Sequence, residues 1–460
     1  MKNAPIARPE ERGPLRTLVR DSARTTRTQL EDILQWSFIF AYRILFLPLF
    51  LLVLPYYTYR MLKRGGYGRH FSHRFGLFPK IPKHKKRIWI QAVSVGEVRA
   101  LQPLIEELQA QNNFEIFLTT TTSTGLQTAE KLFANKIAFI GVFPLNFWLF
   151  SALAWRRIQP TFAFLTESEL WPEHLQQACR HKVPLFLLNG RMSEKSFRRY
   201  QQIPTICRWL FAKITHILAS SDESRQHFIQ LGCPAEKIVT VGNLKLDLSP
   251  SIPPDSAMIA AQKRALGFPE NATILFGAST WPSEETMLAN VLKNTRLYSP
   301  NTYLILLPRH PERRNDISNV LKQTHFSFSF RTDNPSQPND IYVADTIGEM
   351  HKLLPLADIV YVGKSMAPNK GGQSPVDAAL FGKPILYGPY MDNFKPLCKM
   401  LEEQGAAFRC NNEEALEHFI KHLLEDTAVR TSMGHKAALW QQSNQGATAK
   451  TLEALKALGV

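Results

Sequence analysis

Short apolar segments rich in β-branched and aromatic residues alternate with longer amphipathic segments along most of this chain. This alternation predicts strands that each lead into a helix, which is typical of parallel sheets covered by helices on both faces. We expect strands near 87–95, 114–121, 137–143, 161–166, 184–189, 217–219 and 238–241, and then near 273–277, 302–307, 340–344, 358–362 and 384–387. The sequence therefore predicts the α/β class.

A stretch rich in proline and serine, Leu248-Ser249-Pro250-Ser251-Ile252-Pro253-Pro254-Asp255, separates the two groups of strands. A chain of 460 residues has room for two domains with separate cores. We expect Rossmann-like domains at 81–247 and 257–460, a linker at 248–256, and a last helix that is able to cross back to the first domain. Ligands of such paired domains bind in the cleft between the carboxyl ends of the strands. Polar residues that follow strands are therefore the best site candidates.

Charge and cysteine usage narrow the class of function. The formal net charge of +16 favours an anionic partner, which is a nucleic acid, a membrane surface or a phosphorylated substrate. The five cysteines are odd in number and not closely paired, which argues against a disulfide framework or a zinc site and for a reducing compartment. The sequence contains neither a D-x-D motif nor a G-x-x-x-x-G-K-[ST] motif, so a P-loop NTPase is disfavoured and no bound metal is indicated.

An apolar run at 44–57 follows a polar, Arg-rich extension at 1–35. The segment 36–57 has the length of roughly 20 residues that crosses a bilayer, with aromatic residues at both ends. Arg43 and two prolines interrupt it, so an interfacial or re-entrant anchor and a buried core helix are the alternatives. Basic residues beyond the run favour anionic headgroups of the cytoplasmic leaflet. We therefore expect a membrane anchor with a juxtamembrane segment at 36–80.

The segment 358–377 combines an apolar strand, a loop with Gly371-Gly372, and a helix start at Ser374-Pro375. Glycines let the backbone approach a ligand, and a helix N-terminus presents unpaired N–H groups to a phosphate. Asp377 in the first turn is placed to accept hydrogen bonds from ribose hydroxyls. Ser374 and Asp377 equally fit a capping box that needs no ligand.

Carboxylates follow two predicted strands of the first domain. Glu97 comes after Gly96, which is expected to leave it accessible at the rim of the cleft as a general base, although Ser94 and Glu97 also fit a capping box. Glu167 and Glu169 lie at a strand-to-helix turn, and residues at this spacing do not share a helix face, so we expect different roles for them. Convergence of the three acids would raise the pKa of one of them.

Cations follow other strands. The segment 189–199 contains four basic residues, either as a site for a phosphorylated or carboxylated substrate or as a solvated helix face. Arg309 and His310 follow the strand at 302–307, and a guanidinium group holds a phosphate bidentately. The segments 277–285 and 345–350 also follow strands and start helices, where Thr346 and Glu349 fit a simple cap.

In this order, these segments resemble the 3-deoxy-D-manno-octulosonic acid (Kdo) transferases of lipopolysaccharide synthesis. The resemblance covers nearly the whole chain and rests on residues 42–43, 74–76, 92–97, 167–172, 189–196, 241–245, 308–313, 345–349 and 381–384. It implies a GT-B glycosyltransferase fold in which two Rossmann-like domains face a cleft. It also implies transfer of Kdo from CMP-Kdo to a lipid A precursor, with inversion and without metal or cofactor. The implied location is the cytoplasmic face of a bacterial inner membrane, with membrane lipid and no nucleic acid as partner.

The resemblance implies residue roles as well. Glu97 matches the general base, and Glu167 and Glu169 match a second acidic motif that orients the acceptor or sets the charge of Glu97. Arg309 would hold the departing CMP phosphate. The other expected donor-site residues are Ser279, Thr280, His310, Ile347, Gly348, Glu349, Met350, Asn369, Gly371, Gly372, Ser374 and Asp377. Acceptor binding is expected at Arg156, Arg157, Arg191 and Lys195, near the aromatic run 147–150, with Arg60, Lys63 and Arg64 beside the anchor.

Several positions depart from the family pattern. Gln373, Ser374, Asp377 and Ala378 stand where the family usually has G-G-H-N followed by P-x-E-P. Trp281 replaces an expected His, Glu173 an expected Asn, and Lys364 a common glycine. Two alternatives stay open: a GT-B enzyme or epimerase that uses a UDP- or GDP-sugar, and a non-catalytic membrane scaffold that binds anionic lipid.

Overall fold

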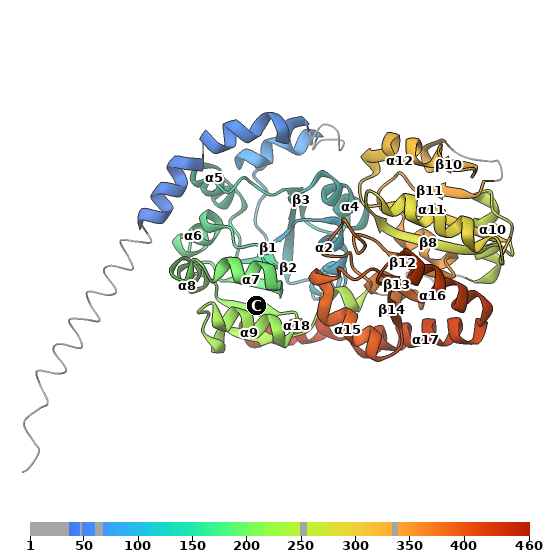
Figure 1. Cartoon of the computed structure of the whole chain (residues 1–460). Coiled ribbons are helices and arrows are strands. Elements are labelled where there is room, and N and C mark those ends of the chain that lie inside the picture. The colour runs from blue at the N-terminus through green and yellow to red at the C-terminus, as the bar shows by residue number, and fades with distance from the viewer. Residues whose placement is uncertain (1–35, 47, 60–67, 249–254, 334–338) are drawn as a thin grey trace, which may run out of the picture.

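Two seven-stranded parallel sheets form the framework of the molecule, one in each half of the chain. The computed structural model describes residues 36–46, 48–59, 68–248, 255–333 and 339–460. Figure 1 shows the two α/β units side by side, with a pair of helices along one end of the first unit. The predicted α/β class is therefore confirmed, whereas the extension 1–35, most of the linker, and Arg60, Lys63 and Arg64 lie outside the described residues.

The first unit has the strand order β3-β2-β1-β4-β5-β6-β7. Its strands are β1 (Lys86–Ala92), β2 (Phe114–Thr120), β3 (Phe139–Val142), β4 (Phe162–Thr166), β5 (Leu185–Gly190), β6 (His216–Ala219) and β7 (Ile238–Thr240). Its helices are α2 (Val95–Ala100), α3 (Gln102–Ala110), α4 (Ser123–Phe133), α5 (Trp148–Ile158), α6 (Pro172–Arg180), α7 (Glu194–Tyr200), α8 (Pro204–Ala212) and α9 (Asp222–Gln230), with 3-10 turns η1 (Gly68–Phe75), η2 (Ala235–Lys237) and η3 (Leu244–Asp247).

The second unit has the order β10-β11-β9-β8-β12-β13-β14. Its strands are β8 (Thr273–Thr280), β9 (Thr302–Pro308), β10 (Phe328–Phe330), β11 (Ile341–Val343), β12 (Ile359–Val362), β13 (Ile385–Tyr387) and β14 (Ala407–Arg409). Its helices are α10 (Ser256–Ala265), α11 (Glu284–Thr295), α12 (Arg314–Leu321), α13 (Met350–Leu353), α14 (Val376–Leu380), α15 (Lys395–Glu403), α16 (Glu413–Glu425) and α17 (Thr427–Ser443), with 3-10 turns η4 (Pro311–Arg313), η5 (Arg331–Asp333), η6 (Leu354–Leu356) and η7 (Asp392–Phe394). A last helix, α18 (Ala447–Ala457), follows.

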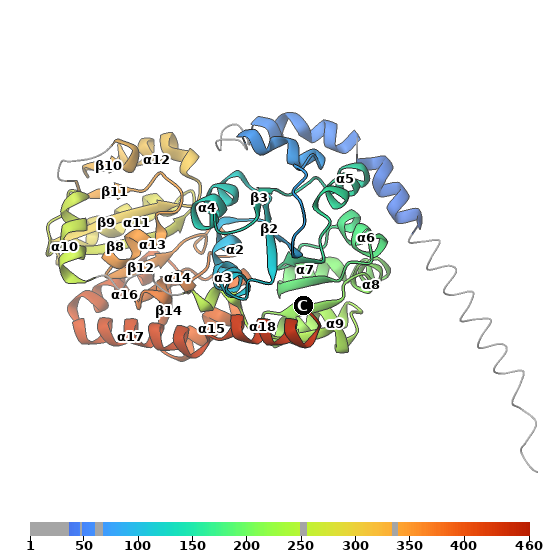
Figure 2. The ribbon, with the colours of Figure 1, turned by 180° about the vertical axis from the view of Figure 1, so that it is seen from behind.

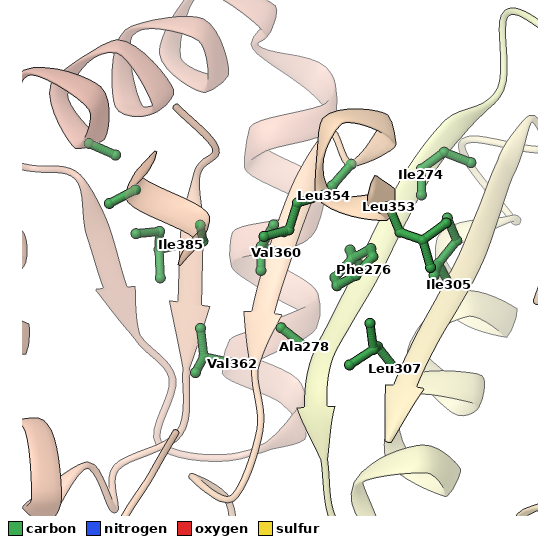
Figure 3. Close-up of a cluster of buried hydrophobic side chains, with 14 of the residues drawn as sticks. Ile274, Phe276, Ala278, Ile305, Leu307, Leu353, Leu354, Val360, Val362 and Ile385 are labelled. Carbon is green, nitrogen blue, oxygen red and sulfur yellow. The ribbon is translucent and has the colours of Figure 1, made fainter. Parts of the chain in front are cut away.

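Both faces of each central strand are buried, as parallel sheets require. In β8, Ile274 and Phe276 face one core cluster, while Leu275 between them faces the other. Figure 3 shows the first of these clusters, where Phe276 lies among Ile305 of β9, Val360 of β12 and their neighbours. Burial of one such side chain contributes about 1.5–3 kcal/mol. The near-continuous apolar runs that predicted the strands are therefore the residues that hold helices onto both faces.

The strand order reverses between β1 and β4 in the first sheet and between β8 and β12 in the second. At such a reversal, the connections from the two neighbouring strands leave toward opposite faces and open a crevice beyond the carboxyl ends of the strands. Glu97 follows β1 and Glu167 follows β4, while Ser279 ends β8 and Gly363 follows β12. The topology alone therefore places these four positions beside the two crevices.

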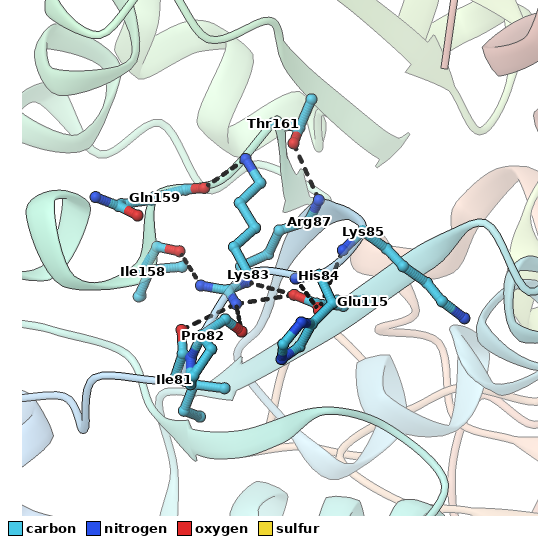
Figure 4. Close-up of polar contacts among 10 residues, drawn as sticks. All are labelled: Ile81, Pro82, Lys83, His84, Lys85, Arg87, Glu115, Ile158, Gln159 and Thr161. Atoms are coloured by element: carbon cyan, nitrogen blue, oxygen red, sulfur yellow. Dashed lines mark hydrogen bonds and ion pairs between the residues drawn. The ribbon is translucent and has the colours of Figure 1, made fainter.

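A buried cation, Arg87, joins the segments that meet at the amino ends of the strands of the first sheet. Arg87 is 0% exposed, and its guanidinium donates to Glu115 at 2.8 and 3.1 Å and to the carbonyl oxygen of Ile158 at 2.6 Å. It also donates to the carbonyls of Ile81 and Pro82, as Figure 4 shows. Because every buried charge needs a partner, this network ties the segment before β1 to the end of α5.

No helix in the described part of the chain is by itself both long and apolar enough to cross a bilayer; Trp36–Phe46 and Pro48–Tyr59 reach that threshold only together, across a 48° bend. Arg43 donates two hydrogen bonds to the fully buried Glu173, at 2.7 and 3.0 Å. Tyr42 donates to the carbonyl oxygen of Asn146 at 2.6 Å. The opposite side is exposed, including Trp36 and Phe40 at 65% and Leu52 at 78%. This exposure contradicts the alternative of a buried core helix.

The chain crosses between the units twice, into the second unit after η3 and back to the first unit between α17 and α18. The α18 helix packs against the first unit, where Ala447 and Leu455 join its core (Figure 2). The Asp247 carboxylate accepts hydrogen bonds from the N–H groups of Gly446 at 2.8 Å, Ala447 at 3.2 Å and Thr448. Gln441 donates to the carbonyls of Leu246 at 2.6 Å and Leu248 at 3.2 Å. The two crossings are thus hydrogen-bonded to each other.

Candidate active site

A cavity of about 260 Å³ lies between the units, beyond the carboxyl ends of the strands that flank both crevices. The first unit contributes Ser94, Val95, Gly96, Arg99 and Lys245 to its walls. The second unit contributes Ser279, Arg309, Thr346, Ile347, Gly348, Met350, His351, Gln373, Ser374, Asp377 and others. Arg99, Lys245 and Arg309 are basic, and Asp377 is the one carboxylate among the lining residues, so the cavity favours an anionic ligand.

Glu97 lies directly behind the first-unit wall of this cavity. Its carboxylate accepts hydrogen bonds from the Val93 N–H at 2.8 Å, the Thr166 hydroxyl at 2.7 Å and the Ser94 hydroxyl at 3.0 Å. The side chain is buried, at 8% exposure, and residues 94–96 rather than Glu97 line the cavity. The expectation of an accessible carboxylate at the rim was therefore wrong. The capping box does not form, because the Ser94 hydroxyl donates to the carboxylate instead of accepting from a helix N–H group, and the carboxylate accepts the N–H of Val93 rather than that of Ser94.

Two neighbours of opposite charge, Glu167 and Lys245, affect the pKa of Glu97. Burial raises the pKa of Glu97 and the negative charge of Glu167 raises it further, against the lowering effects of the Val93 N–H, the Thr166 hydroxyl and the Lys245 ammonium. Glu167 itself bonds Lys245 at 2.6 Å. Burial opposes the ionisation of Glu167, but Lys245 and Arg191 outweigh it and lower the pKa of Glu167. Glu167 therefore stays ionised beside a carboxyl group whose proton affinity is increased.

Glu169 completes the acidic cluster at the turn between β4 and α6. Burial, followed by the charges of Glu97 and Glu167, raises the pKa of Glu169 to about 7. The backbone of Glu167 has a φ of 55°, a left-handed conformation that costs energy for a residue with a side chain. The turn thus directs two acids of different proton affinity toward Glu97.

Arg309 faces the cavity from the end of β9, and its N–H donates to the carbonyl oxygen of Thr280 at 3.0 Å. Ser279 lines the cavity, but Thr280 does not: its side chain is fully buried and its hydroxyl donates to Glu285 at 3.0 Å. Thr280 was expected among the donor contacts, and in the structure it supports the turn instead. Sequence spacing does not distinguish the two, because both residues end the same strand.

The glycine loop differs most from its prediction. The N–H groups of Gly371, Gly372 and Gln373 donate to the carbonyls of Tyr390, Lys364 and Gly363, at 3.1, 2.9 and 3.1 Å. A Cβ at Gly372 would lie 2.4 Å from the Met391 sulfur, so the glycine is required for packing against the 391–393 segment. These N–H groups are therefore not free for a phosphate, and Gln373 and Ser374 face the cavity in their place.

Asp377 faces the cavity and pairs with His351, whose Nε2 lies 2.8 Å from Asp377 Oδ1. Burial opposes the ionisation of Asp377, but the His351 hydrogen bond and charge, with those of Arg99 and Lys245, lower the pKa of Asp377. The Ser374 hydroxyl accepts the Val376 N–H at 3.4 Å, but the Asp377 carboxylate turns to His351, so the reciprocal capping box of Ser374 and Asp377 does not form. The carboxylate is thus held for an interaction across the cavity.

Residues 346–350 form the remaining wall. Ile347, Gly348 and Met350 line the cavity together with Thr346, whose buried hydroxyl has no hydrogen-bond partner among the described residues. Glu349 is buried and lies 3.5 Å from both Arg331 and Lys352. The expected caps by Thr346 and Glu349 do not form, because α13 starts without a side-chain cap bond.

The other predicted residues lie outside this cavity. His310 packs on the edge of Trp281, and Asn369 donates to the carbonyl oxygen of Pro282 at 2.9 Å. Arg191 bonds the Asn393 carbonyl oxygen across the gap between the units, and its guanidinium lies 4.8 Å from the Phe394 ring. Lys195 is exposed on α7.

Arg156 and Arg157 end α5, which leads into the start of β4, so they lie at the sheet edge opposite the carboxyl ends of the strands. Arg157 lines a separate hollow of about 730 Å³ beside η1. The structure therefore does not bring these two arginines together with the inter-unit cavity.

Three functional candidates were missed by the sequence analysis. Lys245 had a signal, since it ends the segment 241–245, but it was given no role. Arg99 lies two residues beyond Glu97, where helical geometry turns it toward the second unit. His351 had no signal, because only the fold brings it to Asp377, 26 residues away.

A family model described as 3-deoxy-D-manno-octulosonic-acid transferase matches residues 69–248 of this chain. A 3-deoxy-D-manno-octulosonic acid transferase of Bordetella pertussis is 32% identical over 380 residues, which are 80% of this chain and 86% of that protein. The chain belongs to this Kdo transferase family. A second member, from Haemophilus influenzae, is 28% identical over 410 residues, which are 88% of this chain and 95% of that protein.

Solved structures support the same fold for this Kdo transferase family member. HepE of Anabaena, in complex with UDP-glucose, matches with a TM-score of 0.57 at 15% identity, over 81% of this chain and 99% of that chain. A UDP-GlcNAc 2-epimerase of Neisseria meningitidis matches with a TM-score of 0.54 at 11% identity, over 81% and 100%. At such identities the likeness concerns the fold alone, and the predicted GT-B-like arrangement is confirmed.

Proposed function

We propose that this Kdo transferase binds CMP-Kdo in the inter-unit cavity and transfers Kdo to a lipid A precursor, in the synthesis of the lipopolysaccharide core. The observation that carries the proposal is the arrangement of the cavity. Three cations line it, and the cluster of Glu97, Glu167 and Glu169 lies behind its first-unit wall. An anionic leaving group and a group that accepts a proton are what glycosyl transfer from a nucleotide sugar needs.

The cations suit the phosphate of the donor. Arg309, Arg99 and Lys245 reach the cavity from three different elements, so charge that develops on the departing CMP phosphate is stabilised from several directions. Asp377, oriented by His351, is placed for the ribose hydroxyls, and the Thr346 hydroxyl is a ready partner for the base. A volume of about 260 Å³ is small beside the roughly 300–1,000 Å³ of ligand sites, so the units must open for the whole donor to enter.

Glu97 is the general base of this proposal. The acceptor hydroxyl oxygen bonds to the anomeric carbon of Kdo, the carbon–oxygen bond to CMP breaks with its electron pair on the phosphate, and the hydroxyl proton ends on Glu97. Ser94 lines the cavity and donates to Glu97 at 3.0 Å, so its hydroxyl connects the two and can pass the proton inward. A raised pKa suits this role, because a base works best when its pKa is close to the working pH.

The acceptor is proposed to approach along the helix pair from the cytoplasmic face of the inner membrane. The exposed apolar side of the pair and the exposed Trp148 and Leu149 at the start of α5 are candidates for contact with acyl chains. The two elements touch where Phe46 stacks on Phe147. The net charge of +16 favours the anionic headgroups and the acceptor phosphates. Arg191 and Lys195 remain proposed acceptor contacts, and Arg156 and Arg157 are proposed for headgroups away from the cavity.

The test is mass analysis of the product after the full chain is incubated with lipid A precursor and freshly generated CMP-Kdo. We expect the acceptor mass to increase by one or more Kdo units, and binding competition to favour CMP over UDP. In Glu97→Gln transfer should fall by at least about 100-fold, while Glu106→Gln, an exposed change on α3, should leave it unchanged. Vesicle binding without any product would instead support the membrane scaffold.

A further inference from the structure

Glu284, the first residue of α11, is buried at 1% exposure and is surrounded by hydrogen-bond donors. Its Oε2 accepts from the N–H groups of Trp281 at 2.9 Å and Lys364 at 2.8 Å. Its Oε1 accepts from the N–H of Ser365 at 2.9 Å, the N–H of Met366 at 3.2 Å and the Tyr361 hydroxyl at 3.1 Å. One carboxylate thus joins the turn after β8 to the loop after β12.

These two segments approach closely at Gly363. A Cβ at this position would lie 2.5 Å from the Ser279 carbonyl oxygen and 2.8 Å from the Thr280 Cα. The Gly363 N–H also donates to the carbonyl oxygen of Ala278 at 2.9 Å. The backbones therefore meet without intervening side chains, and Glu284 supplies the acceptors that the N–H groups of the loop need.

The contact extends to two parts of the second-unit wall of the inter-unit cavity. On one side, Ser279 lines the cavity directly. On the other, Gly363 and Lys364 accept hydrogen bonds from Gln373 and Gly372, and Gln373 lines the cavity with Ser374. The spacing between these two parts is thus set by a carboxylate that does not itself face the cavity.

The same carboxylate pairs two side chains that depart from the family pattern. Trp281 and Lys364 both donate their N–H groups to Glu284 Oε2, and the Lys364 ammonium lies 4.5 Å from the Trp281 ring. The Trp281 ring also makes a T-shaped contact with the ring of His310, which follows Arg309 in the chain. A cation beside an indole face is a favourable contact, so the two departures support each other.

We propose that Glu284 is a positioning residue of the donor site, which holds the Ser279 turn and the 363–374 loop at the spacing that CMP requires. This rests on the proposed function of the cavity. Glutamine at this position retains one carbonyl oxygen and turns an NH₂ group toward N–H donors, so the loop loses acceptors and separates from the turn.

The test compares Glu284→Gln with Asp358→Asn. Asp358 accepts the Ile274 N–H at 2.8 Å at the amino ends of strands β12 and β8, the ends away from the cavity. This control therefore also exchanges an acid for an amide beside a backbone N–H. Calorimetry should show CMP binding weakened about tenfold in Glu284→Gln, as loss of one charge-assisted acceptor implies. Binding by Asp358→Asn should equal that of wild type.

Hydrogen exchange gives a readout that does not depend on the ligand. The peptide 363–374 should exchange faster in Glu284→Gln than in wild type and Asp358→Asn, with no ligand added. If Glu284→Gln does not fold, Tyr361→Phe removes the phenol that donates to Glu284 and accepts from the Ser365 hydroxyl, and it should weaken CMP binding and speed exchange in the same peptide to a smaller extent. Unchanged CMP binding in the tested variant would overturn the inference. A wild-type chain that binds no CMP would overturn the proposed function and, with it, this role of Glu284.

Discussion

The charge of one side chain, Glu97, is controlled by two neighbours of opposite sign. Burial raises the pKa of Glu97, Glu167 raises it further and Lys245 lowers it, although these two neighbours are hydrogen-bonded to each other at 2.6 Å. The general base that we propose acts only when it has lost its proton, so transfer is expected above the pKa of Glu97 and should be lost as the pH falls through it. Each neighbour therefore sets the position of the acidic limb of the rate profile.

Glu167→Gln removes a negative charge, so the pKa of Glu97 should fall and the acidic limb of kcat/KM should move to lower pH. Lys245→Met removes a positive charge, so the limb should move to higher pH. Each shift is expected to be about 0.5–1 pH unit, the size of one screened charge at this range. Rate profiles from pH 5 to 9 measure both, with Glu106→Gln as the control that should not shift.

Opposite directions in the two variants are the decisive feature, since a general loss of packing would lower the rate without moving the limb. Limbs that stay at the same pH in both variants would mean that Glu97 is not the group whose ionisation is observed.

At the scale of elements, the helix pair is joined to the first unit by a polar contact rather than by apolar packing alone. Glu173 starts α6 and is fully buried, and Arg43 is its ion-pair partner. Asn146 accepts the Glu173 N–H at 3.0 Å and donates to Tyr42 at 2.8 Å, so both residues of the 42–43 pair contact this one corner. Because α6 follows the acidic turn, the helix pair is fixed next to Glu167 and Glu169.

Arg43→Met should destabilise this junction by about 3 kcal/mol, because it leaves a buried carboxylate without its cation. Thermal unfolding and protease cleavage within 36–59 measure the effect, and the double variant with Glu173→Asn should recover most of the loss. Arg198→Met breaks an exposed pair with Glu194, which solvent already screens, and should leave the unfolding temperature nearly unchanged. An Arg43→Met protein as stable as wild type would show that the ion pair does not hold the helices.

Much of this framework follows from local sequence. Twelve strands were expected near their observed positions. The two that were missed, β10 and β14, are three-residue strands at the edges of the second sheet, and each fully buries one of its three residues. Positions after strand ends were also predictable, since parallel topology brings them together.

What the sequence does not contain is the tertiary environment of each side chain. The burial of Glu97 depends on Thr166, 69 positions away. The Gly371-Gly372 pair is typical of a phosphate loop, but here it is required by close packing against Met391 and Asn393. Arg43 interrupts the apolar run and therefore weakened the prediction of a membrane anchor. The sequence does not reveal that this charge is paired, because its partner Glu173 lies 130 residues further along the chain.

At the scale of the whole molecule, the two crossings of the chain lie together and restrict how the units move. Asp247 at the end of η3 holds the start of α18, and Gln441 near the end of α17 holds the backbone on either side of Asp247. We therefore expect the opening proposed for the cavity to be a bend about this paired connection, with α18 moving as part of the first unit.

Asp247→Ala should loosen α18, because three N–H groups at the start of the helix lose their acceptor, at a cost of about 1–2 kcal/mol. Hydrogen exchange within 447–457 should become faster. Asp255→Ala removes a comparable cap from α10, where Asp255 accepts the Met258 N–H at 2.6 Å, and should leave α18 unaffected. Equal exchange of α18 in wild type and Asp247→Ala would contradict this role.

The return of α18 to the first unit also has a consequence for biosynthesis. The first unit is translated before the second, yet its core lacks Ala447 and Leu455 until the strands of the second unit have also been made. At roughly 5–20 residues per second, the delay between the helix pair and α18 is about 20–80 s. We therefore expect the nascent chain to expose the apolar side of its helix pair before the core of the first unit is complete, and this is the interval in which a bilayer or a chaperone would have access to it.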